Sequence, residues 1–363
     1  MSGRVPTRQG DQSVSALKSA EVCQSAPDDQ AAIAQLLYST FGGAPRLLSP
    51  ELLQWKFFSG RTDSTASRSY VFREDGKIQA HAAEWPLSFL TPSGEISSCH
   101  VIDWAARPEA KGTGVRVYQH LMEKNETLIA IGGTARAREL RPLLGFQPHG
   151  AVDFFARTVR PWRQYRSRPQ RAGMRDLARL ARNCIWNSQP LAAPEANWQI
   201  VPISDVRRLP LKALRVKTST MCLGVRTPSW LRYIMDCPVM ECSLFVLAKA
   251  GVMRGHFLLN QVAGRCRIID LAVESEEPAD WVSAYSAAVS AALRDPRTCE
   301  ILMASSLPWL SDAMREMGFR LRKRSPVMVY DPSGRLMNGP PLCLQMTDSD
   351  ACFLYDEDYP FWT

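Results

Sequence analysis

The chain has 363 residues, of which 44 are basic and 36 are acidic, so its formal net charge is +8. With 45% hydrophobic and 22% charged residues it has an ordinary globular composition, and its length predicts two domains. The whole excess charge lies in residues 157–182, which contain nine arginines and one acid, Asp176. Because the other residues sum to zero, composition argues against a general coating of nucleic acid or membrane and leaves a local basic site as the question.

Targeting and metal signals are absent from the sequence. It contains no run of 18 apolar residues, so we expect neither a transmembrane helix nor membrane insertion. We interpret residues 1–24 as a flexible leader, because they lack the apolar region of a signal peptide. Ten scattered cysteines without a C-x-x-C pair indicate reduced thiols and a cytoplasmic protein, and five histidines without metal-ligand spacing predict no metal.

One pattern of elements occurs twice along the chain. Each copy has a Pro-to-aromatic segment (50–55 and 228–233), a hairpin (arms 70–72 and 78–80, or 244–247 and 256–259) and an apolar strand (152–155 and 327–330). From the turn glycine, Gly76 or Gly251, it is 69 or 67 residues to the Gly-Phe pair that precedes the strand. These spacings favour two copies of one fold, with chance matching as the alternative.

The basic segment joins the two copies. Its second part predicts an amphipathic helix from Met174 to Ile185, whose apolar face should dock on a domain. For its arginines the alternatives are a solvated surface, docking to an acidic surface and contact with phosphate. The tail after residue 330 has a strand-like segment at 342–346 and then the acids Asp348, Asp350, Asp356, Glu357 and Asp358. Three roles are open for these acids: they bind a substrate amine, they pair with the linker arginines, or they are simply solvated.

Residues 101–116 carry the strongest chemical signal. They predict a strand, a short loop with two glycines, and a helix from about Val115 to Lys124. Backbone N–H groups and the positive end of the helix dipole form an anion site there, and Lys111 and Arg116 add positive charge. Pyrophosphate is the natural ligand. The loop is not a Walker loop, because the pattern G-x-x-x-x-G-K-[ST] is absent. It is not a dinucleotide-binding fingerprint either, because the third glycine is missing.

This order of elements resembles the GNAT acyltransferase family, whose loop reads [Gln/Arg]-x-x-Gly-x-[Gly/Ala]. The resemblance rests on the hairpin, the loop, the strand at 128–131 and the pair Gly145-Phe146, and it departs from the pattern at both ends of the loop. It implies an α/β class fold (α+β, mixed sheet) with two GNAT-like domains joined by an Arg-rich, partly helical linker. The expected divisions are leader 1–24, first domain 25–160, linker 161–196, second domain 197–335 and tail 336–363.

The resemblance also implies a site for acetyl-CoA as cosubstrate. Its pyrophosphate would lie on Lys111, Gly112, Thr113, Gly114, Val115 and Arg116, and its pantetheine along Trp104, Ala105 and Ala106. The amine of a small molecule or amino sugar would attack the thioester directly, which requires a base. The candidates are Glu84, which we prefer, then Asp103 and His100, each with an ordinary structural role as the alternative. Arg141 replaces the tyrosine that serves as an acid in the family, and Met314 replaces it in the second copy.

The second copy differs at the loop. Its strand, 267–273, is followed by four acids and by no glycine or basic residue, which predicts that the second domain binds no CoA. Two other functions stay open. One is a Fem-type peptidyltransferase that takes aminoacyl-tRNA and uses the arginines on RNA phosphates. The other is a CoA-binding or scaffold protein without catalysis.

Overall fold

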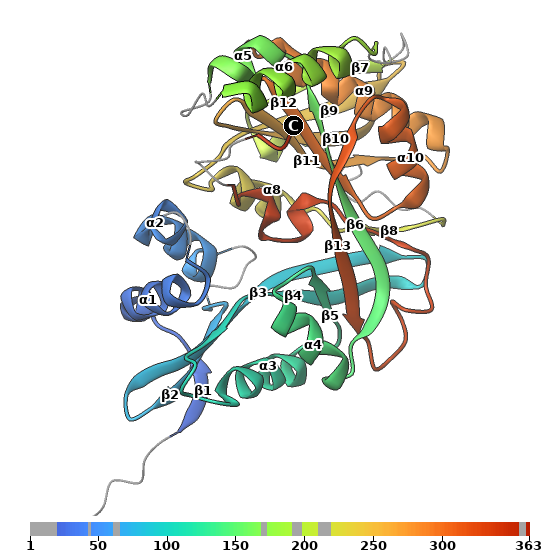
Figure 1. Cartoon of the computed structure of the whole chain (residues 1–363). Coiled ribbons are helices and arrows are strands. Elements are labelled where there is room, and N and C mark those ends of the chain that lie inside the picture. Colours follow the sequence, from blue (N-terminus) through green and yellow to red (C-terminus); the bar gives the residue numbers. More distant parts are fainter. Residues whose placement is uncertain are drawn as a thin grey trace, which may run out of the picture.

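The structure is a computed structural model that describes residues 20–42, 45–60, 66–167, 173–190, 198–209, 219–355 and 361–363. Most of the predicted leader, and Asp356, Glu357 and Asp358 of the tail, lie outside these residues. The described chain builds one continuous mixed sheet of 14 strands with helices packed on it, so the predicted α/β class with a mixed sheet is confirmed (Figure 1).

The elements fall into an N-terminal half, residues 21–158, and a C-terminal half, residues 198–330, connected by two helices. The strands are β1 Glu21–Gln24, β2 Ser69–Glu74, β3 Lys77–Thr91, β4 Gly94–Ala106, β5 Leu128–Ile131, β6 Gln147–Thr158, β7 Trp198–Ile203, β8 Cys222–Gly224, β9 Glu241–Lys249, β10 Val252–Val262, β11 Arg265–Val273, β12 Glu300–Ser305, β13 Arg320–Tyr330 and β14 Leu342–Cys343. The α-helices are α1 Gln30–Phe41, α2 Pro50–Leu53, α3 Thr113–Lys124, α4 Ala135–Leu143, α5 Pro161–Arg166, α6 Gly173–Asn187, α8 Pro228–Met235, α9 Pro278–Arg294 and α10 Pro308–Glu316.

Short helical turns complete the described chain. The 3-10 turns are η1 Pro27–Asp29, η2 Pro45–Leu48, η4 Val206–Arg208, η5 Met346–Asp348 and η6 Asp350–Cys352, and η3 Gln54–Phe58 is a π-helical turn. The tail after β13 therefore forms only a two-residue strand where the sequence predicts one at 342–346. It then continues as η5 and η6, and both turns are packed into the body of the protein.

Both predicted hairpins are confirmed, and their turns are alike. In β2–β3 the turn residues Asp75 and Gly76 have φ of 51° and 74°, and in β9–β10 Ala250 and Gly251 have φ of 52° and 76°. Two consecutive positive φ values define a type I′ turn, whose twist matches that of the flanking strands. A glycine at the second position makes this conformation accessible in both copies.

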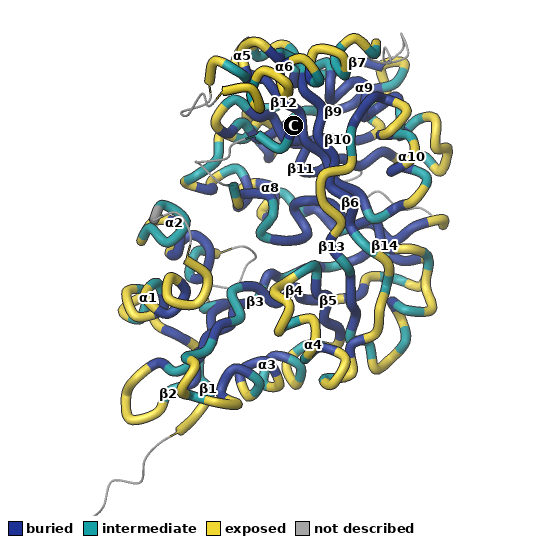
Figure 2. The backbone as a smooth tube through the Cα atoms, viewed as in Figure 1, coloured by how far each residue is buried: buried dark blue, intermediate teal, exposed yellow. Residues whose placement is uncertain are grey.

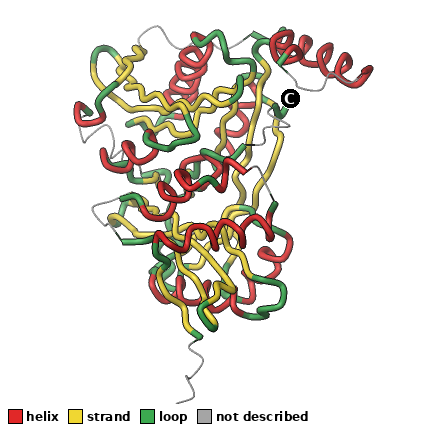
Figure 3. Tube along the Cα trace, turned by 90° about the vertical axis from the view of Figure 1, so that its left-hand side faces the viewer, coloured by secondary structure: helices red, strands yellow, loops and turns green. Residues whose placement is uncertain are grey.

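The strands of the two halves are exchanged at the centre of the sheet. The order is β1-β2-β3-β4-β5-β13-β6-β12-β11-β10-β9-β7. Thus β13 lies antiparallel between β5 and β6, and β6 pairs antiparallel with β12. Figure 1 shows β6 and β13 as long neighbouring strands that connect the lower and upper parts of the molecule, and Figure 3 shows the long strands from the side. The repeated strands at 152–155 and 327–330 therefore hold the two halves together.

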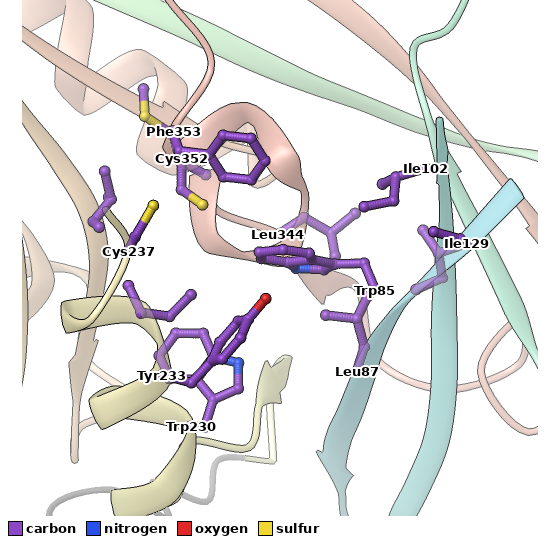
Figure 4. Packing of buried hydrophobic residues seen from close by; sticks show 14 of the residues in the cluster. Trp85, Leu87, Ile102, Ile129, Trp230, Tyr233, Cys237, Leu344, Cys352 and Phe353 are labelled. Carbon is purple, nitrogen blue, oxygen red and sulfur yellow. The ribbon is translucent and has the colours of Figure 1, made fainter. Parts of the chain in front are cut away.

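Aromatic side chains from both halves and from the tail share one core. Trp55 stacks on Tyr233 of α8 with ring centroids 4.5 Å apart, and Phe353 of the tail meets Trp55 edge-on at 5.4 Å. Figure 4 shows Trp85 of β3 lying between Tyr233 and Phe353 in the same cluster. Because these contacts bury large apolar surfaces, the halves and the tail are expected to unfold together. Figure 2 shows this buried interior in dark blue.

The helix predicted at Met174–Ile185 is present as α6, but the prediction that its apolar face docks on the protein is wrong. Met174, Leu177 and Ile185 are 85%, 52% and 71% exposed, whereas α6 is buried at Leu180 and Asn183. Its contacts are with α5 and β6, and the Asn183 amide donates a 2.8 Å hydrogen bond to Gln164 Oε1. The hydrophobic periodicity correctly indicated a helix, but the polar anchor at Asn183 turns the apolar stripe outward.

Arginines at the start of the basic segment are part of the fold. Arg157 is buried and donates to the carbonyls of Met317 and Gln189. The guanidinium of Arg160 donates to the carbonyls of Leu293, Asp295 and Thr298 around the C-terminus of α9. Cations at a helix C-terminus satisfy carbonyls that have no partner within the helix and complement its dipole. These arginines therefore join the linker to the C-terminal half.

Three further observations concern the chain as a whole. No helix among the described residues is both long and apolar enough to cross a bilayer. All ten cysteines lie in described parts of the chain and are free, and most are buried. Within the same residues, no three His, Cys, Asp or Glu side chains are gathered so that they could hold a metal ion.

Candidate functional site

A cavity opens where β4 and β5 separate. The two parallel strands pair only at Cys99–Leu128 and His100–Ile129, and beyond these pairs a cavity of about 250 Å³ lies between them. Its charged and polar lining comes from β4, from α4 and the residues just before it, from β13 and from η6 with the residue before it. The lining residues that matter below are His100, Asp103, Trp104, Gly132, Arg141, Lys323 and Asp350.

A bulge in β4 sets the position of Asp103. The pairing with β3 shifts from Ala83–Ile102 to His81–Ala105, and Asp103 has a φ of 52°, which is rare for a residue with a side chain. The Asp103 carboxylate lies 2.5 Å from Lys56 Nζ. Lys56 is only 4% exposed and comes from η3, so this ion pair joins the bulge to the segment after α2.

Asp350 reaches the cavity from the tail. It begins η6, and the preceding Ser349 side chain accepts a hydrogen bond from the Ala351 N–H. Burial raises the pKa of Asp350 to about 6; Asp103 adds to this increase, while Lys56 and Lys323 oppose it. A carboxyl group with a pKa near 6 is mostly ionised at pH 7 and still able to accept a proton, which is the property of a general base.

The three predicted base candidates are in different places. Asp103 and His100 line the cavity. Burial lowers the pKa of His100 to about 4, and its Nδ1 lies 2.9 Å from the Ile129 carbonyl, so the ring is neutral with Nδ1 as donor. Glu84 does not line the cavity, because its carboxylate accepts hydrogen bonds from Asn125 Nδ2 at 2.8 Å and the Tyr70 hydroxyl at 3.4 Å.

The loop after β4 has the predicted form. Gly112 has a φ of 85° and is the N-cap of α3, which begins at Thr113, two residues earlier than expected. The Trp104 indole N–H donates a 2.7 Å hydrogen bond to the Gly114 carbonyl. A Cβ on Gly114 would lie 3.1 Å from the Ala106 Cβ and 3.2 Å from Trp104 Nε1, so a larger residue here would require β4 or its side chains to shift by a few tenths of an ångström.

These features fit a phosphate group of CoA. The first N–H groups of a helix have no acceptor within the helix, and they point toward the loop. Lys111 and Arg116 are exposed beside them, and the Arg116 guanidinium lies 4.7 Å from the centre of the Phe72 ring. Thr113 donates its hydroxyl to the Ala110 carbonyl at 2.7 Å, so its side chain closes the loop. Ala105 is buried beside Trp104 on the strand that leads into this loop.

Arg141 forms one wall of the cavity. It is 4% exposed and donates a 2.5 Å hydrogen bond to the Gly132 carbonyl at the end of β5. Its guanidinium would meet a Cβ on Gly133 at 3.0 Å, so the two glycines after β5 make room for it. The sequence marked Arg141 as the residue in place of the family's tyrosine, and the structure places its positive charge in the cavity.

Three residues at or next to the cavity were not among the sequence candidates. Lys323 and Asp350 line it, and Lys56 is the ion-pair partner of Asp103. Lys56 and Lys323 are separated from Asp103 by tens or hundreds of residues, and Asp350 was noted only as one of several tail acids. Lys56 is in an otherwise apolar segment, where a lone buried charge indicates a specific partner. For Lys323 and Asp350 the sequence holds no such signal, since strand exchange and the path of the tail bring them here.

A larger and more open groove of about 670 Å³ lies between η3 and α8. Glu51, Arg232 and Asp236 line its exposed sides, and Trp55 and Tyr233 form its floor. We place the chemistry in the smaller cavity, because Asp103 and Asp350 line it and because its wall includes β4, the strand that leads into the anion-binding loop.

The fold is that of the GCN5-related N-acetyltransferases. A GCN5-related N-acetyltransferase from Anabaena variabilis is similar over 86% of this chain and 73% of its own, with a TM-score of 0.58 and 11% identity. A conserved protein of unknown function from Enterococcus faecalis matches 86% of this chain and 72% of its own, with a TM-score of 0.53 and 12% identity.

An N-myristoyltransferase is among the similar structures. The enzyme from Saccharomyces cerevisiae with bound myristoyl-CoA matches over 89% of this chain and 85% of its own, with a TM-score of 0.55 and 10% identity. At such identities the similarity establishes the fold and not the reaction. No family model matches the sequence, and no curated protein matches it.

Proposed function

We propose that the protein is an acyl-CoA-dependent N-acyltransferase. The observation that carries this proposal is the cavity between β4 and β5, where Asp103 and Asp350 lie together and β4 leads directly into an anion-binding loop. The similar structures include N-acetyltransferases and a myristoyl-CoA complex, which supports CoA thioesters as the class of donor. We further propose acetyl-CoA as the donor and a small molecule or amino sugar as the acceptor, as the sequence predicts.

Each charged residue in or next to the cavity has a separate role in the direct transfer of the acyl group. The acceptor ammonium loses a proton to Asp350, and the free amine then attacks the thioester carbonyl. The new C–N bond forms as the C–S bond breaks, and the thiolate leaves with the electron pair. The second proton of the attacking nitrogen passes to this thiolate, so the products are an amide and the free thiol of CoA. Arg141 and Lys323 provide positive charge in the cavity for the developing anions, and Asp103, held by Lys56, attracts the ammonium.

The proposed base is Asp350, in preference to the sequence candidates. Glu84 is engaged by Asn125 and Tyr70 outside the cavity, and His100 has a pKa of about 4, which makes it a weak base at neutral pH. The Asp103 carboxylate is already engaged in an ion pair with Lys56 Nζ at 2.5 Å. Asp350 has the raised pKa and a partly open position in the cavity.

We also propose that the chain is an internal duplication with the divisions predicted above, 25–160 and 197–335, connected by 161–196 and followed by 336–363. The first copy is extended to Glu21, because residues 21–24, expected to be the end of a flexible leader, form strand β1 and pair with β2. The support is the order of strands in the sheet, which reads the same from both ends when β1, β2, β3, β4, β5 and β6 are matched with β7, β9, β10, β11, β12 and β13. Helices α3 and α9, and α4 and α10, follow the matched strands in the same way.

The test of the proposed reaction is thiol release from acetyl-CoA and myristoyl-CoA with a panel of amino sugars and polyamines. We expect release that depends on both donor and amine, and the comparison of the two donors decides the acyl length. CoA binding by calorimetry without release for any amine would favour the non-catalytic alternative. Absence of CoA binding would overturn the proposal. The tRNA alternative has less support, because Arg157 and Arg160 are engaged by backbone carbonyls.

A further inference from the structure

Helix α6 presents an apolar face away from the protein. Met174, Leu177 and Ile185 are 85%, 52% and 71% exposed, and Ala181 is exposed between them. With about 100° of rotation per residue, these four positions fall within an arc of about 80°. The buried residues Leu180 and Asn183 lie on another side of the helix, so the docking of α6 leaves the apolar arc uncovered.

Basic residues flank this arc, and the neighbouring helix α5 carries an exposed tryptophan. Arg175 and Arg179 are exposed on one flank of α6, and Arg179 lies 3.6 Å from Asp176. On the neighbouring helix α5, Trp162 is 62% exposed. In Figure 1 the two helices lie together at the top of the molecule. In Figure 2 much of the tube along these helices has the colour of exposed residues. An apolar stripe flanked by Arg and accompanied by Trp is typical of a helix that lies in a membrane interface.

We propose that α6 and Trp162 bind the surface of a bilayer that contains anionic phospholipids. Charge decides between this occupant and a second copy of the chain. Helix α6 carries three arginines, Arg175, Arg179 and Arg182, against one acid, Asp176, so two copies packed through this face would bring like charges together. An anionic lipid surface takes up the apolar arc and attracts the flanking arginines at once. The 15-residue helix lies on the membrane and does not cross it.

Vesicle sedimentation of the full chain tests this inference. With vesicles of phosphatidylcholine and phosphatidylglycerol in equal parts we expect binding that weakens with added salt, and little binding to phosphatidylcholine alone. The double variant Leu177→Asp/Ile185→Asp should bind the mixed vesicles at least about tenfold more weakly, because it places charge on the buried arc. Val252→Asp, a similar change at a 53% exposed apolar residue outside α6, is the matched control and should bind as wild type.

Thermal unfolding followed by circular dichroism confirms that both variants are folded, which is expected because the changed side chains are exposed. Equal binding of neutral and anionic vesicles would overturn the proposal, as would mixed-vesicle binding that survives the double variant. A dimer in solution that Leu177→Asp/Ile185→Asp dissociates, without vesicle binding by wild type, would also overturn it and assign the face to a second copy. None of these outcomes bears on the proposed acyl transfer, which is measured without lipid.

Discussion

In the duplication proposed above, β4 with α3 in the N-terminal half is matched with β11 and α9 in the C-terminal half, but the connections between strand and helix differ. The first has Gly112, Gly114 and basic side chains, whereas the second is acidic from Glu274 to Asp280. Strand β4 pairs with β5 at two positions and then separates, whereas β11 pairs with β12 at four positions and is buried along its whole length. Under the proposed match, a cavity therefore lies beside β4, whereas the corresponding strand β11 is buried along its whole length.

Two aspartates at strand bulges, Asp103 in β4 and Asp270 in β11, have different surroundings. Asp103 and Asp270 occupy corresponding positions, each on a strand that bulges against its hairpin partner. Asp103 faces the cavity with Lys56, whereas Asp270 is fully enclosed by Arg226, His256 and Thr347. Arg226 and His256 hold the pKa of Asp270 well below its usual range. The C-terminal half therefore uses this position for structure.

The tail fills the C-terminal counterpart of the cavity. The Gln345 side chain accepts a 2.7 Å hydrogen bond from the Leu271 N–H and donates one of 2.8 Å to the Leu271 carbonyl. Leu271 corresponds to Trp104, where the family resemblance places pantetheine. An amide of the protein itself thus takes the backbone groups that a CoA amide would need. This, together with the acidic loop, supports the prediction that the C-terminal half binds no CoA.

The largest expected effect concerns the buried charges around Asp270. Arg226→Met should lower the free energy of unfolding by about 3–5 kcal/mol, because it leaves the carboxylates of Asp270 and Asp348 buried without their cation. Lys56→Met, the corresponding change in the N-terminal half, should cost less, since Asp103 is 15% exposed. Urea unfolding of both variants measures the difference. Equal losses of unfolding free energy in the two variants would contradict the view that the Arg226–Asp270 pair serves stability while the Lys56–Asp103 pair serves function.

Asp350→Asn should reduce acyl transfer about 100-fold at pH 7, because it removes the general base. Wild-type kcat/KM should fall as the pH drops through about 6, where Asp350 becomes protonated and can no longer accept a proton, and the variant should lack this acid limb. Thiol-release kinetics from pH 5 to 8 provide the measurement. Glu84→Gln is the control and should retain activity; the reverse result would return the role to Glu84.

Gln345→Ala should lower the free energy of unfolding by about 2 kcal/mol, since it leaves the N–H and carbonyl of Leu271 without partners in the core. Calorimetric titration should still find a single CoA site, because the acidic loop after β11 remains. A second CoA site in this variant would show that the tail alone closes the C-terminal half. Thermal unfolding and the titration are made on the same preparation.

Gly112→Val should weaken CoA binding by about tenfold, because a β-branched residue is strained at a φ of 85° and displaces the N–H groups of the loop. The control is Gly94→Val, which has a φ of 127° and, like Gly112, no neighbouring atom within 4 Å of an added Cβ. Equal affinity of Gly112→Val and wild type would contradict the assigned phosphate loop. Glu274→Val, in the acidic loop, should leave the affinity unchanged.

Local signals in the sequence determined much of this protein. The hairpin turns follow from residues that accept positive φ, helix α3 from its apolar spacing, and the anion-binding loop from glycines directly before a helix. Strand β5 lies at residues 128–131, as expected. These features depend on neighbours within a few residues, so they can be derived without knowing the rest of the fold.

Only the tertiary structure decided which distant residues meet. The repeated strands were recognisable, but their exchange between β5 and β12 depends on pairing across more than a hundred residues. Helix α6 was predicted, yet which of its faces points outward depends on the hydrogen bond between Asn183 and Gln164 of α5. Likewise, Asp350 enters the cavity because the tail packs against Trp55 and Trp85. Hydrophobic burial rewards any arrangement that covers apolar surface, and only the complete set of contacts selects one of them.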